Sequence, residues 1–154
     1  MYNRALVATD GSESALGAIE LAKELMLSGV VKSVILINVV ENIVDWKTYS
    51  IINTKFDNEE EFNKALSKKG SKILQPGHKL FKQSGLTVDS LVRFGKPEEE
   101  IVKNAESLKC DLIIMGNRGL SKIKDIVLGS VSQKVMHLAK VGVIVYKPEA
   151  TTWK

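Results

Sequence analysis

The sequence predicts an α/β protein: a single doubly wound, Rossmann-like sheet of five parallel strands in the order 3-2-1-4-5, with helices on both faces. Apolar runs of strand length alternate with segments of helical period, which indicates parallel strands joined by crossover helices. The run at 34–40 is apolar except for Asn38, as expected of a strand that is covered on both faces. A chain of 154 residues, 44% of them hydrophobic, is long enough for one compact domain. Right-handed crossovers then give the doubly wound arrangement.

The first half of the chain begins with a strand at 5–9 and a turn at Asp10, Gly11 and Ser12. A helix follows and ends near Gly29, because apolar residues recur at spacings of three and four: Ala15, Ala18, Ile19, Ala22, Leu25 and Met26. The second strand covers 34–40. Residues 41–57 show no clean period, which predicts a long loop or lid.

The second half begins with a polar helix at 59–83, which Pro76 and Gly77 are expected to kink or break. The third strand covers 88–94. The next helix starts at Pro97 and carries three glutamates in its first turn, where acids complement the positive helix end. A fourth strand at 112–115, a helix at 130–139 and a last strand from Val143 to Tyr146 complete the domain. Residues 1–148 are expected to form this one domain and 149–154 a short tail.

Composition excludes several function classes. The net charge of +4 and the pI near 9.1 are only mildly basic, and the lysines are interleaved with acids, so nucleic-acid binding is not indicated. Cys110 is the only cysteine, which rules out an internal disulfide and suits a reducing compartment. The apolar runs are too short to span a bilayer. A cytoplasmic protein without a membrane anchor is expected.

The stretch MGNRGLSKIKDIVLGSVS, residues 115–132, contains three glycines. Gly116 directly follows the fourth strand, Gly119 lets the loop fold back, and Gly129 precedes a helix that opens at Ser130. Leu120, Ile123, Ile126 and Val127 recur at helical spacing, which predicts a short packed helical turn within the loop. Backbone N–H groups surround a phosphate where no side chain blocks their approach, so this pattern indicates a phosphate site.

Each glycine alone would be ordinary turn punctuation. Neither of the two commonest phosphate motifs is present: there is no G-x-x-x-x-G-K-[ST], and no G-x-G-x-x-G follows the first strand. The combination of glycines after a buried strand carries the prediction. The expected position is the carboxyl edge of the sheet, where turns 9–12, 95–97 and 116–132 meet.

The pattern Gly116-x-x-Gly119-(nine residues)-Gly129-Ser130 resembles the ATP-binding signature of the universal stress protein family. The resemblance extends to ALVATDGSESA at 5–15, Val39-Val40, FGKPEEEI at 94–101 and DLIIMG at 111–116, in the family's order. Essentially the whole chain is covered. The resemblance implies the same fold and a bound ATP, with Mg²⁺ or Mn²⁺ carried on the phosphates.

The resemblance also implies which residues line the site. Adenosine would lie against Ala8, Thr9, Asp10 and Val39. Ribose and phosphates would approach Met115, Gly116 and Gly119, and the phosphate chain would be held by Gly129, Ser130, Val131 and Ser132. Arg118 is either a phosphate partner or a solvated loop arginine, and Asp10 either a ribose or metal ligand or a helix cap. Two departures are Val141-Gly142, where many relatives have proline before the last strand, and Ala8, where some have proline.

Several other reactive residues are read as structural. Glu98, Glu99 and Glu100 suit a helix start rather than a metal site, and His137 has no ligand-type neighbour in sequence. Cys110 is read as a structural thiol. Lys64, Lys68 and Lys72 are read as a solvated helix face, and Trp46 and Tyr49 as part of a loop folded onto the core, or else a lid or partner surface.

Three functions remain open. The first is an ATP-binding stress-response or regulatory protein, a nucleotide-dependent switch with weak or no ATPase activity, because no general base accompanies the phosphate site. The second is an adenylate-forming enzyme related to ATP pyrophosphatases, which usually carry S-G-G-x-D-S where this chain has TDGSES at 9–14. The third is an interaction module of the same fold that binds no nucleotide. A phospho-receiver or flavin module of similar topology is a further class, and the receiver is disfavoured because Phe94-Gly95 stands where its aspartate would be. The apolar strand from Val143 to Tyr146 is expected at a sheet edge, where it would pair with a second copy in a homodimer.

Overall fold

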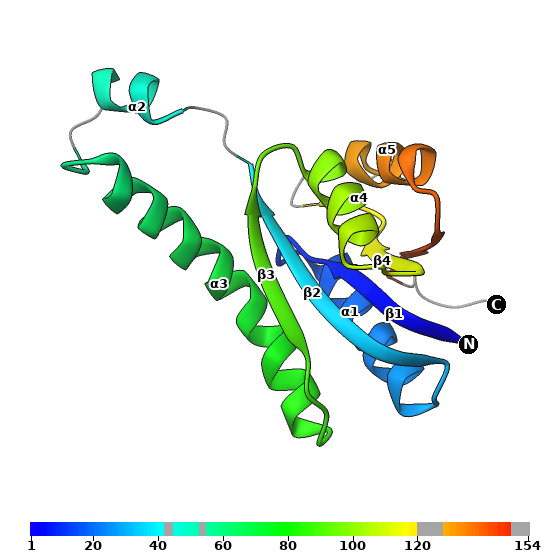
Figure 1. The fold of residues 1–154 in the computed structure, drawn as a ribbon. Helices are drawn as coiled ribbons and strands as arrows, with labels where there is room; N and C mark the ends of the chain where they lie inside the picture. Colours follow the sequence, from blue (N-terminus) through cyan, green and yellow to red (C-terminus); the bar gives the residue numbers. More distant parts are fainter. Residues whose placement is uncertain (42–44, 53–54, 120–127, 149–154) are drawn as a thin grey trace.

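The computed structural model describes residues 1–41, 45–52, 55–119 and 128–148. It contains one five-stranded parallel sheet in the order β3-β2-β1-β4-β5, which confirms the predicted topology (Figure 1). The elements are β1 (Tyr2–Ala8), α1 (Glu13–Leu27), β2 (Val31–Val40), α2 (Trp46–Ile52), α3 (Glu59–Gln83), β3 (Asp89–Phe94), α4 (Pro97–Ser107), β4 (Leu112–Gly116), α5 (Ser130–Leu138) and β5 (Gly142–Tyr146). The predicted helical turn at 120–127 and the tail at 149–154 lie outside the described residues.

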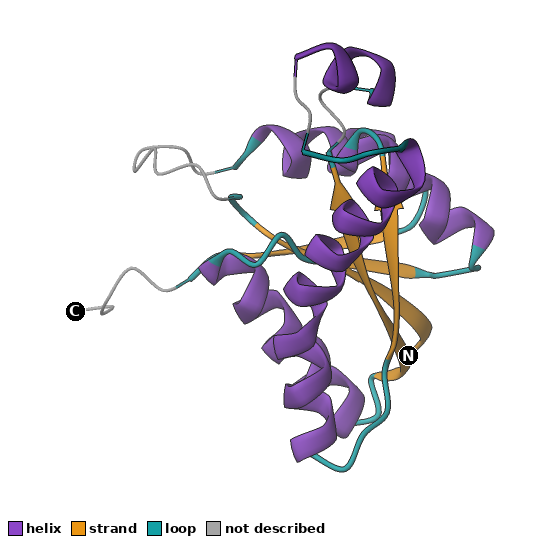
Figure 2. Cartoon of the chain, turned by 90° about the vertical axis from the view of Figure 1, so that its left-hand side faces the viewer, coloured by secondary structure: helices purple, strands orange, loops and turns teal. Residues whose placement is uncertain are grey.

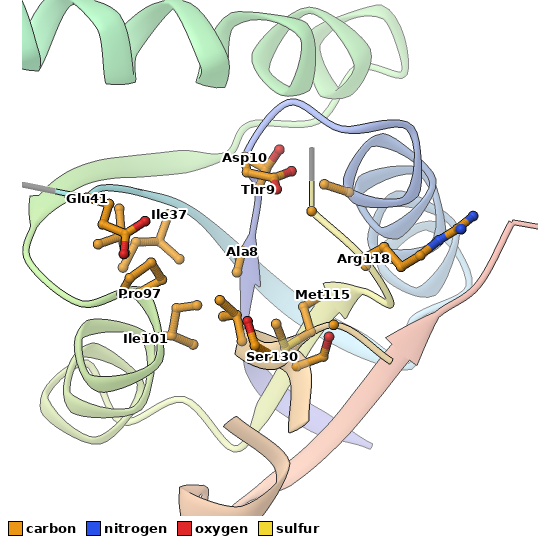
Figure 3. A pocket seen from close by; sticks show the side chains of 17 residues that line it. Ala8, Thr9, Asp10, Ile37, Glu41, Pro97, Ile101, Met115, Arg118 and Ser130 are labelled. Carbon is orange, nitrogen blue, oxygen red and sulfur yellow. The ribbon is translucent and has the colours of Figure 1, made fainter. Parts of the chain in front are cut away.

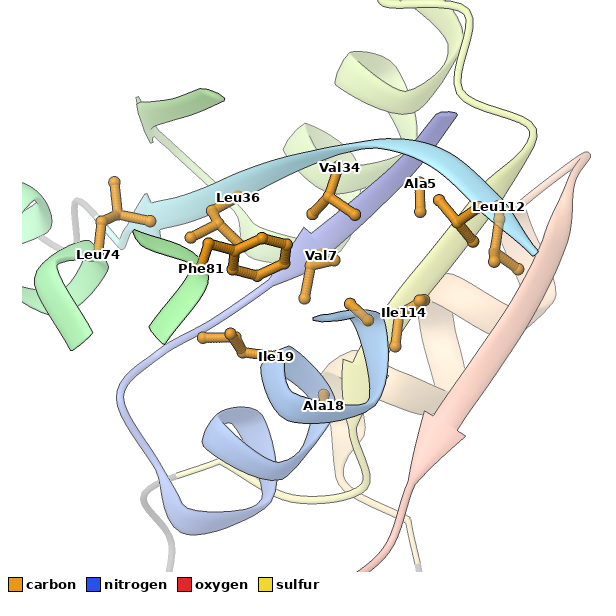
Figure 4. Packing of buried hydrophobic residues seen from close by; sticks show 12 residues of the cluster. Ala5, Val7, Ala18, Ile19, Val34, Leu36, Leu74, Phe81, Leu112 and Ile114 are labelled. Atoms are coloured by element: carbon orange, nitrogen blue, oxygen red, sulfur yellow. The ribbon is translucent and has the colours of Figure 1, made fainter. Parts of the chain in front are cut away.

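Helices cover both faces of the sheet, as the continuous apolar strands predicted (Figure 2). On one face α1 and α3 pack their side chains, such as Ile19 and Phe81, against Val7 and Leu36 (Figure 4). On the other face Ile101 of α4 and Val135 of α5 pack against the strand residues that point to that side, such as Leu6 and Ile37. The order puts β5 at one edge of the sheet, as predicted for that strand.

The long helix α3 is unbroken, although Pro76 lies inside it. The sequence predicted a kink or a break at this point, and the break is wrong. The helix lies close to the sheet: a Cβ on Gly77 would stand 2.5 Å from Leu36 Cδ1, and one on Gly70 would stand 2.5 Å from Val92 Cγ1. Leu74 and the core residues beyond Pro76 hold both halves against the same strands, so packing outweighs the hydrogen bond that proline removes.

Residues 41–57 were predicted as a loop, but they contain the short helix α2. The carboxylate of Asp45 accepts the N–H of Thr48 at 2.7 Å and so caps the start of this helix, which was not predicted from the sequence. Its aromatic side chains pack against Phe62 of α3, with ring centroids 5.7 Å away for Trp46 and 4.8 Å for Tyr49. The helix therefore packs on the start of α3 and buries none of its own residues fully.

No helix in the described part of the chain is both long and apolar enough to cross a membrane.

Candidate functional site

A pocket of about 570 Å³ opens at the carboxyl ends of β1, β2 and β4, a size typical of small-molecule sites (Figure 3). All twelve predicted site residues line it: Ala8, Thr9, Asp10, Val39, Met115, Gly116, Arg118, Gly119, Gly129, Ser130, Val131 and Ser132. Five further lining residues were missed: Ala15, Ile37, Glu41, Pro97 and Ile101. The position is the one at which doubly wound sheets bind their ligands.

One end of the pocket is apolar. Val39 and Ile37 form part of its floor, since alternate residues of β2 point to the same face of the sheet. Pro97 and Ile101, at the start of α4, form the opposite wall. This end can take a flat apolar group.

The centre of the pocket lies beyond the end of β1, where Thr9 and Asp10 offer a hydroxyl and a carboxylate. Thr9 Oγ1 accepts the N–H of Gly11 at 3.2 Å, and Asp10 Oδ1 accepts the N–H of Ser12 at 2.9 Å. The cap of α1 is Ser12, whose hydroxyl accepts the N–H of Ala15 at 3.3 Å. Asp10 therefore shapes the turn with one carboxylate oxygen and keeps the other, Oδ2, for the pocket.

Gly116 and Gly119 are required for close approach rather than for an unusual backbone angle. A Cβ on Gly116 would overlap the side chain of Ser14 and stand 2.8 Å from the backbone nitrogen of Ala15, so this glycine lets β4 pack against α1. A Cβ on Gly119 would stand 2.8 Å from Asp10 Oδ2. The absence of a side chain at Gly119 keeps that carboxylate oxygen clear. Gly116 instead serves helix–strand packing, a role that its spacing in the sequence does not indicate.

The carbonyl oxygen of Asn117 joins the two ends of the glycine loop. It accepts the N–H of Gly129 at 2.6 Å and the hydroxyl of Ser132 at 3.0 Å. The N–H of Asn117 in turn donates to the carbonyl of Tyr146 in β5 at 2.8 Å. The loop is anchored on its other side by Ser14, whose hydroxyl donates to the carbonyl of Arg118 at 2.6 Å. The return of the chain from Gly119 to Gly129 is thus fixed by backbone bonds that side-chain patterns do not reveal.

The start of α5 presents unused backbone donors to the pocket. Its N-cap is Gly129, which offers no side-chain cap. The N–H groups of Ser130, Val131 and Ser132 have no acceptor among the described residues, because the first helical bond is that of Gln133 to Gly129. Ser130 is exposed and lines the pocket, while Ser132 is buried and its hydroxyl proton is committed to Asn117. Free N–H groups in the first turn of a helix attract anions.

Arg118 lines the pocket, but its guanidinium points away from Ala8 and Ile37 (Figure 3). The helices α4 and α5 both contribute residues to the pocket lining. They are joined by an ion pair between Glu98 of α4 and Lys134 of α5 at 2.7 Å. This contact holds the pKa of Glu98 below its usual range and raises that of Lys134. The glutamates at the start of α4 thus form part of the scaffold.

Residues that could suggest other chemistry lie elsewhere. Cys110 is buried, and burial raises the pKa of its thiol, so it is not an activated nucleophile. His137 is an exposed residue of α5 outside the pocket. Within the described ranges, no three histidine, cysteine or acidic side chains are placed to hold a metal ion.

The five missed residues differ in how well the sequence could have signalled them. Ala15, Ile37 and Ile101 follow core periodicities, so nothing in the pattern separates a pocket wall from a core position. Pro97 was placed in a turn at the correct edge. Glu41 continues the alternation of Ile37 and Val39 by one step, a signal that the irregular segment after it concealed.

The fold and the pocket together define a doubly wound α/β domain with a pocket at the carboxyl edge of the sheet, apolar at one end and lined by backbone donors at the other. Comparison with known proteins identifies the family. The model of the universal stress protein family matches residues 1–147, and the chain belongs to that family.

Individual relatives agree along the whole chain. Universal stress protein YxiE of Bacillus subtilis is 31% identical over 150 residues, which cover 96% of this chain and 100% of that protein. Universal stress protein MJ0577 of Methanocaldococcus jannaschii is 31% identical over 156 residues, 96% of each chain. The solved structure of MJ0577 superposes with a TM-score of 0.81 at 30% identity, covering 98% of this chain and 99% of that one.

Another solved structure is that of a universal stress protein in complex with cAMP, with a TM-score of 0.67 at 26% identity, covering 94% of this chain and 96% of that one.

Proposed function

We propose that this chain binds an adenine nucleotide, ATP in the first place, and acts as a regulatory switch in the stress response with slow or no hydrolysis. The observation that carries the proposal is the pocket itself, in which the unused N–H groups of Ser130, Val131 and Ser132 face a space whose far end is apolar. A nucleotide likewise has a flat apolar base at one end and anionic phosphates at the other. The complex of a relative with cAMP supports an adenine nucleotide as the ligand.

The lining residues fit the parts of a nucleotide. The apolar end at Ile37, Val39 and Pro97 suits a base, and the Asp10 carboxylate suits ribose hydroxyls. Phosphates would be held by the start of α5 and the hydroxyl of Ser130, with Ser132 positioning the loop through Asn117. A single exposed helix start contributes about 0.3–1 kcal/mol, so several donors must act together. Mg²⁺ or Mn²⁺ would enter on the phosphates.

Slow turnover is supported by the ionisable side chains of the described lining, which are Asp10, Glu41 and Arg118. One carboxylate oxygen of Asp10 already accepts the N–H of Ser12, and Glu41 lies at the apolar end. Neither is arranged as a general base beside the proposed phosphate donors. We therefore expect binding to dominate over hydrolysis.

The switch is proposed to act through a homodimer joined along β5. The edge position of β5 leaves one side of its backbone without a neighbouring strand in the described chain. Asn117 bonds to both Gly129 at the pocket and Tyr146 at the end of β5, so a ligand that orders the loop would also act on the edge strand. Such coupling would let nucleotide occupancy influence the partner.

Isothermal titration calorimetry with ATP, ADP, AMP and cAMP tests the proposal, together with mass analysis of any nucleotide released when freshly purified protein is denatured. We expect at least one adenine nucleotide to bind and to co-purify. Failure of all four to bind, with or without Mg²⁺, would overturn it.

A further inference from the structure

The carboxylate of Glu41 lies at the apolar end of the pocket. Ile37 and Val39 are alternate residues at the end of β2, Glu41 directly follows the strand, and all three line the pocket. Figure 3 shows Glu41 beside Ile37 and Pro97, with Ser130 at a separate part of the rim. An acid at the end of an apolar row is chemically distinct from its surroundings.

The order of the strands assigns this end to the base. The proposed phosphate donors follow β4, Asp10 follows β1, and Glu41 follows β2, and these strands are adjacent in the order β2-β1-β4. Neighbouring strands lie about 4.8 Å apart, which is comparable to the step from phosphate to sugar and from sugar to base. A nucleotide lying across the strand ends therefore brings its sugar to Asp10 and its base to Glu41.

A carboxylate accepts hydrogen bonds and donates none. Glu41 makes no hydrogen bond or ion pair to another residue in the described ranges. Its charge acts on Lys134 of α5, but the ammonium of that lysine is paired with Glu98 at 2.7 Å. The carboxylate is therefore available to a ligand. It would accept a hydrogen bond from an amino group on the base and would repel a carbonyl oxygen at the same place.

We infer that Glu41 selects the base by accepting a hydrogen bond from its exocyclic amine, so that the pocket takes 6-aminopurine nucleotides and rejects 6-oxopurine nucleotides. This inference rests on the proposed nucleotide binding. It assigns Glu41 a role in specificity and leaves phosphate binding to the glycine loop and α5.

The test measures the affinities of the whole protein for ATP and for inosine triphosphate, in which a carbonyl replaces the amine, by calorimetry at constant Mg²⁺. We expect ATP to bind at least about tenfold more tightly. Glu41→Gln should bring the two affinities to within about twofold, since a side-chain amide can turn to donate or to accept. The matched control is Glu99→Gln, which removes the same charge from an exposed α4 residue outside the pocket and should keep the wild-type ratio.

The possible failures are distinguishable. If neither nucleotide binds, the proposed function fails and this inference fails with it. If both bind but the wild-type protein does not discriminate, or if Glu41→Gln keeps the discrimination, this inference alone is overturned. A parallel titration with 2′-deoxy-ATP covers the remaining assignment: if Glu41→Gln weakens ATP but not 2′-deoxy-ATP, Glu41 contacts the ribose and the inference is again overturned.

Discussion

Gly129 donates its backbone N–H to the carbonyl oxygen of Asn117 over 2.6 Å, and this bond fastens the start of α5 beside the end of β4. The two residues are twelve positions apart in the chain. The bond brings the glycine loop and the unused donors of α5 to one side of the pocket, so substitutions around it test the site directly.

Gly129→Val should abolish tight ATP binding. A Cβ at this position would stand 3.3 Å from the Asn117 oxygen and 3.5 Å from Arg118 Cα, so a branched side chain must push the loop away from α5. We expect a loss of affinity of at least about tenfold by calorimetry, equivalent to about 1.4 kcal/mol. Gly142→Val is the control, because its Cβ would be at an ordinary 3.5 Å from Leu112 Cδ1 and lies outside the pocket. Unchanged affinity in Gly129→Val would refute the assignment of the loop.

Two serines on α5 should separate binding from stability. Ser130→Ala removes an exposed pocket hydroxyl and should weaken ATP binding by about 1–3 kcal/mol if that hydroxyl meets a charged phosphate oxygen. Ser132→Ala removes a buried donor to Asn117 and should lower the free energy of unfolding by about 1 kcal/mol. Urea denaturation and calorimetry on both variants check this. If Ser130→Ala lowers stability and leaves affinity unchanged, the two roles have been assigned wrongly.

Gly17→Ala should destabilise the fold through Tyr146. A Cβ on Gly17 would overlap the Tyr146 ring and stand 2.6 Å from its Cζ, so the ring must move. We expect a cost of about 1–3 kcal/mol in the free energy of unfolding, measured by urea denaturation. The same substitution in a Tyr146→Leu background should cost clearly less, because the clashing ring is gone. Equal costs in both backgrounds would show that the contact does not matter.

The carboxylate of Asp111 gives a defined pH dependence. It accepts the N–H groups of Asn3 at 2.8 Å and Arg4 at 2.9 Å, which hold the pKa of Asp111 below its ordinary value of 3.8. The ionised group therefore stabilises the fold fully above the unfolded pKa, and this contribution disappears as the pH falls through the lower folded pKa. Asp111→Asn should cost about 1 kcal/mol at pH 7, and its difference from wild type should shrink below pH 3.8. A difference that stays constant from pH 7 to pH 2 would contradict the prediction.

Val143→Pro should separate the proposed dimer. The carbonyl of Tyr146 accepts from Asn117, at the end of β4, and alternate strand residues share a side, so the N–H of Val143 faces the open edge of β5. Proline there removes an outward donor without removing a bond to β4. Light scattering should show a dimer for wild type and a monomer for the variant at micromolar concentration. A monomeric wild-type protein would refute the dimer outright.

The sequence was sufficient for the presence of every strand, because apolar runs and helical periods are local patterns, and the alternation of strands and helices indicates parallel pairing. The strand order is less local, and its prediction was supported by the resemblance to the family. The sequence was insufficient for α3, where Pro76 predicted a kink or break and tertiary packing through Gly70 and Gly77 keeps the helix whole. It was also insufficient for α2, whose aromatic residues are organised by Phe62, a residue outside the irregular segment.

The site shows the same division. The glycines, Ser130 and the strand ends could be placed in advance from their spacing along the chain. The individual contacts, such as Ala8, Val39 and Ser132, were implied by the resemblance to the family. The second wall, formed by Pro97 and Ile101, reads as turn and core in sequence. The hydrogen bonds of Asn117 with Gly129 and Tyr146 join backbone atoms that every residue carries, so no pattern of side chains could predict them.

Trp46 stacks on Tyr49 of α2 and makes a tilted ring contact with Phe62 of α3, so its indole can serve as an optical reporter. Its ring centroid lies 5.7 Å from that of Phe62 and 6.3 Å from that of Tyr49, while the protein's second tryptophan is Trp153 in the tail. In a Trp153→Phe protein, indole emission would come from this aromatic cluster alone. Fluorescence titration with nucleotide would then reveal whether ligand binding at the pocket changes the surroundings of α2, a helix that contributes no residue to the pocket lining.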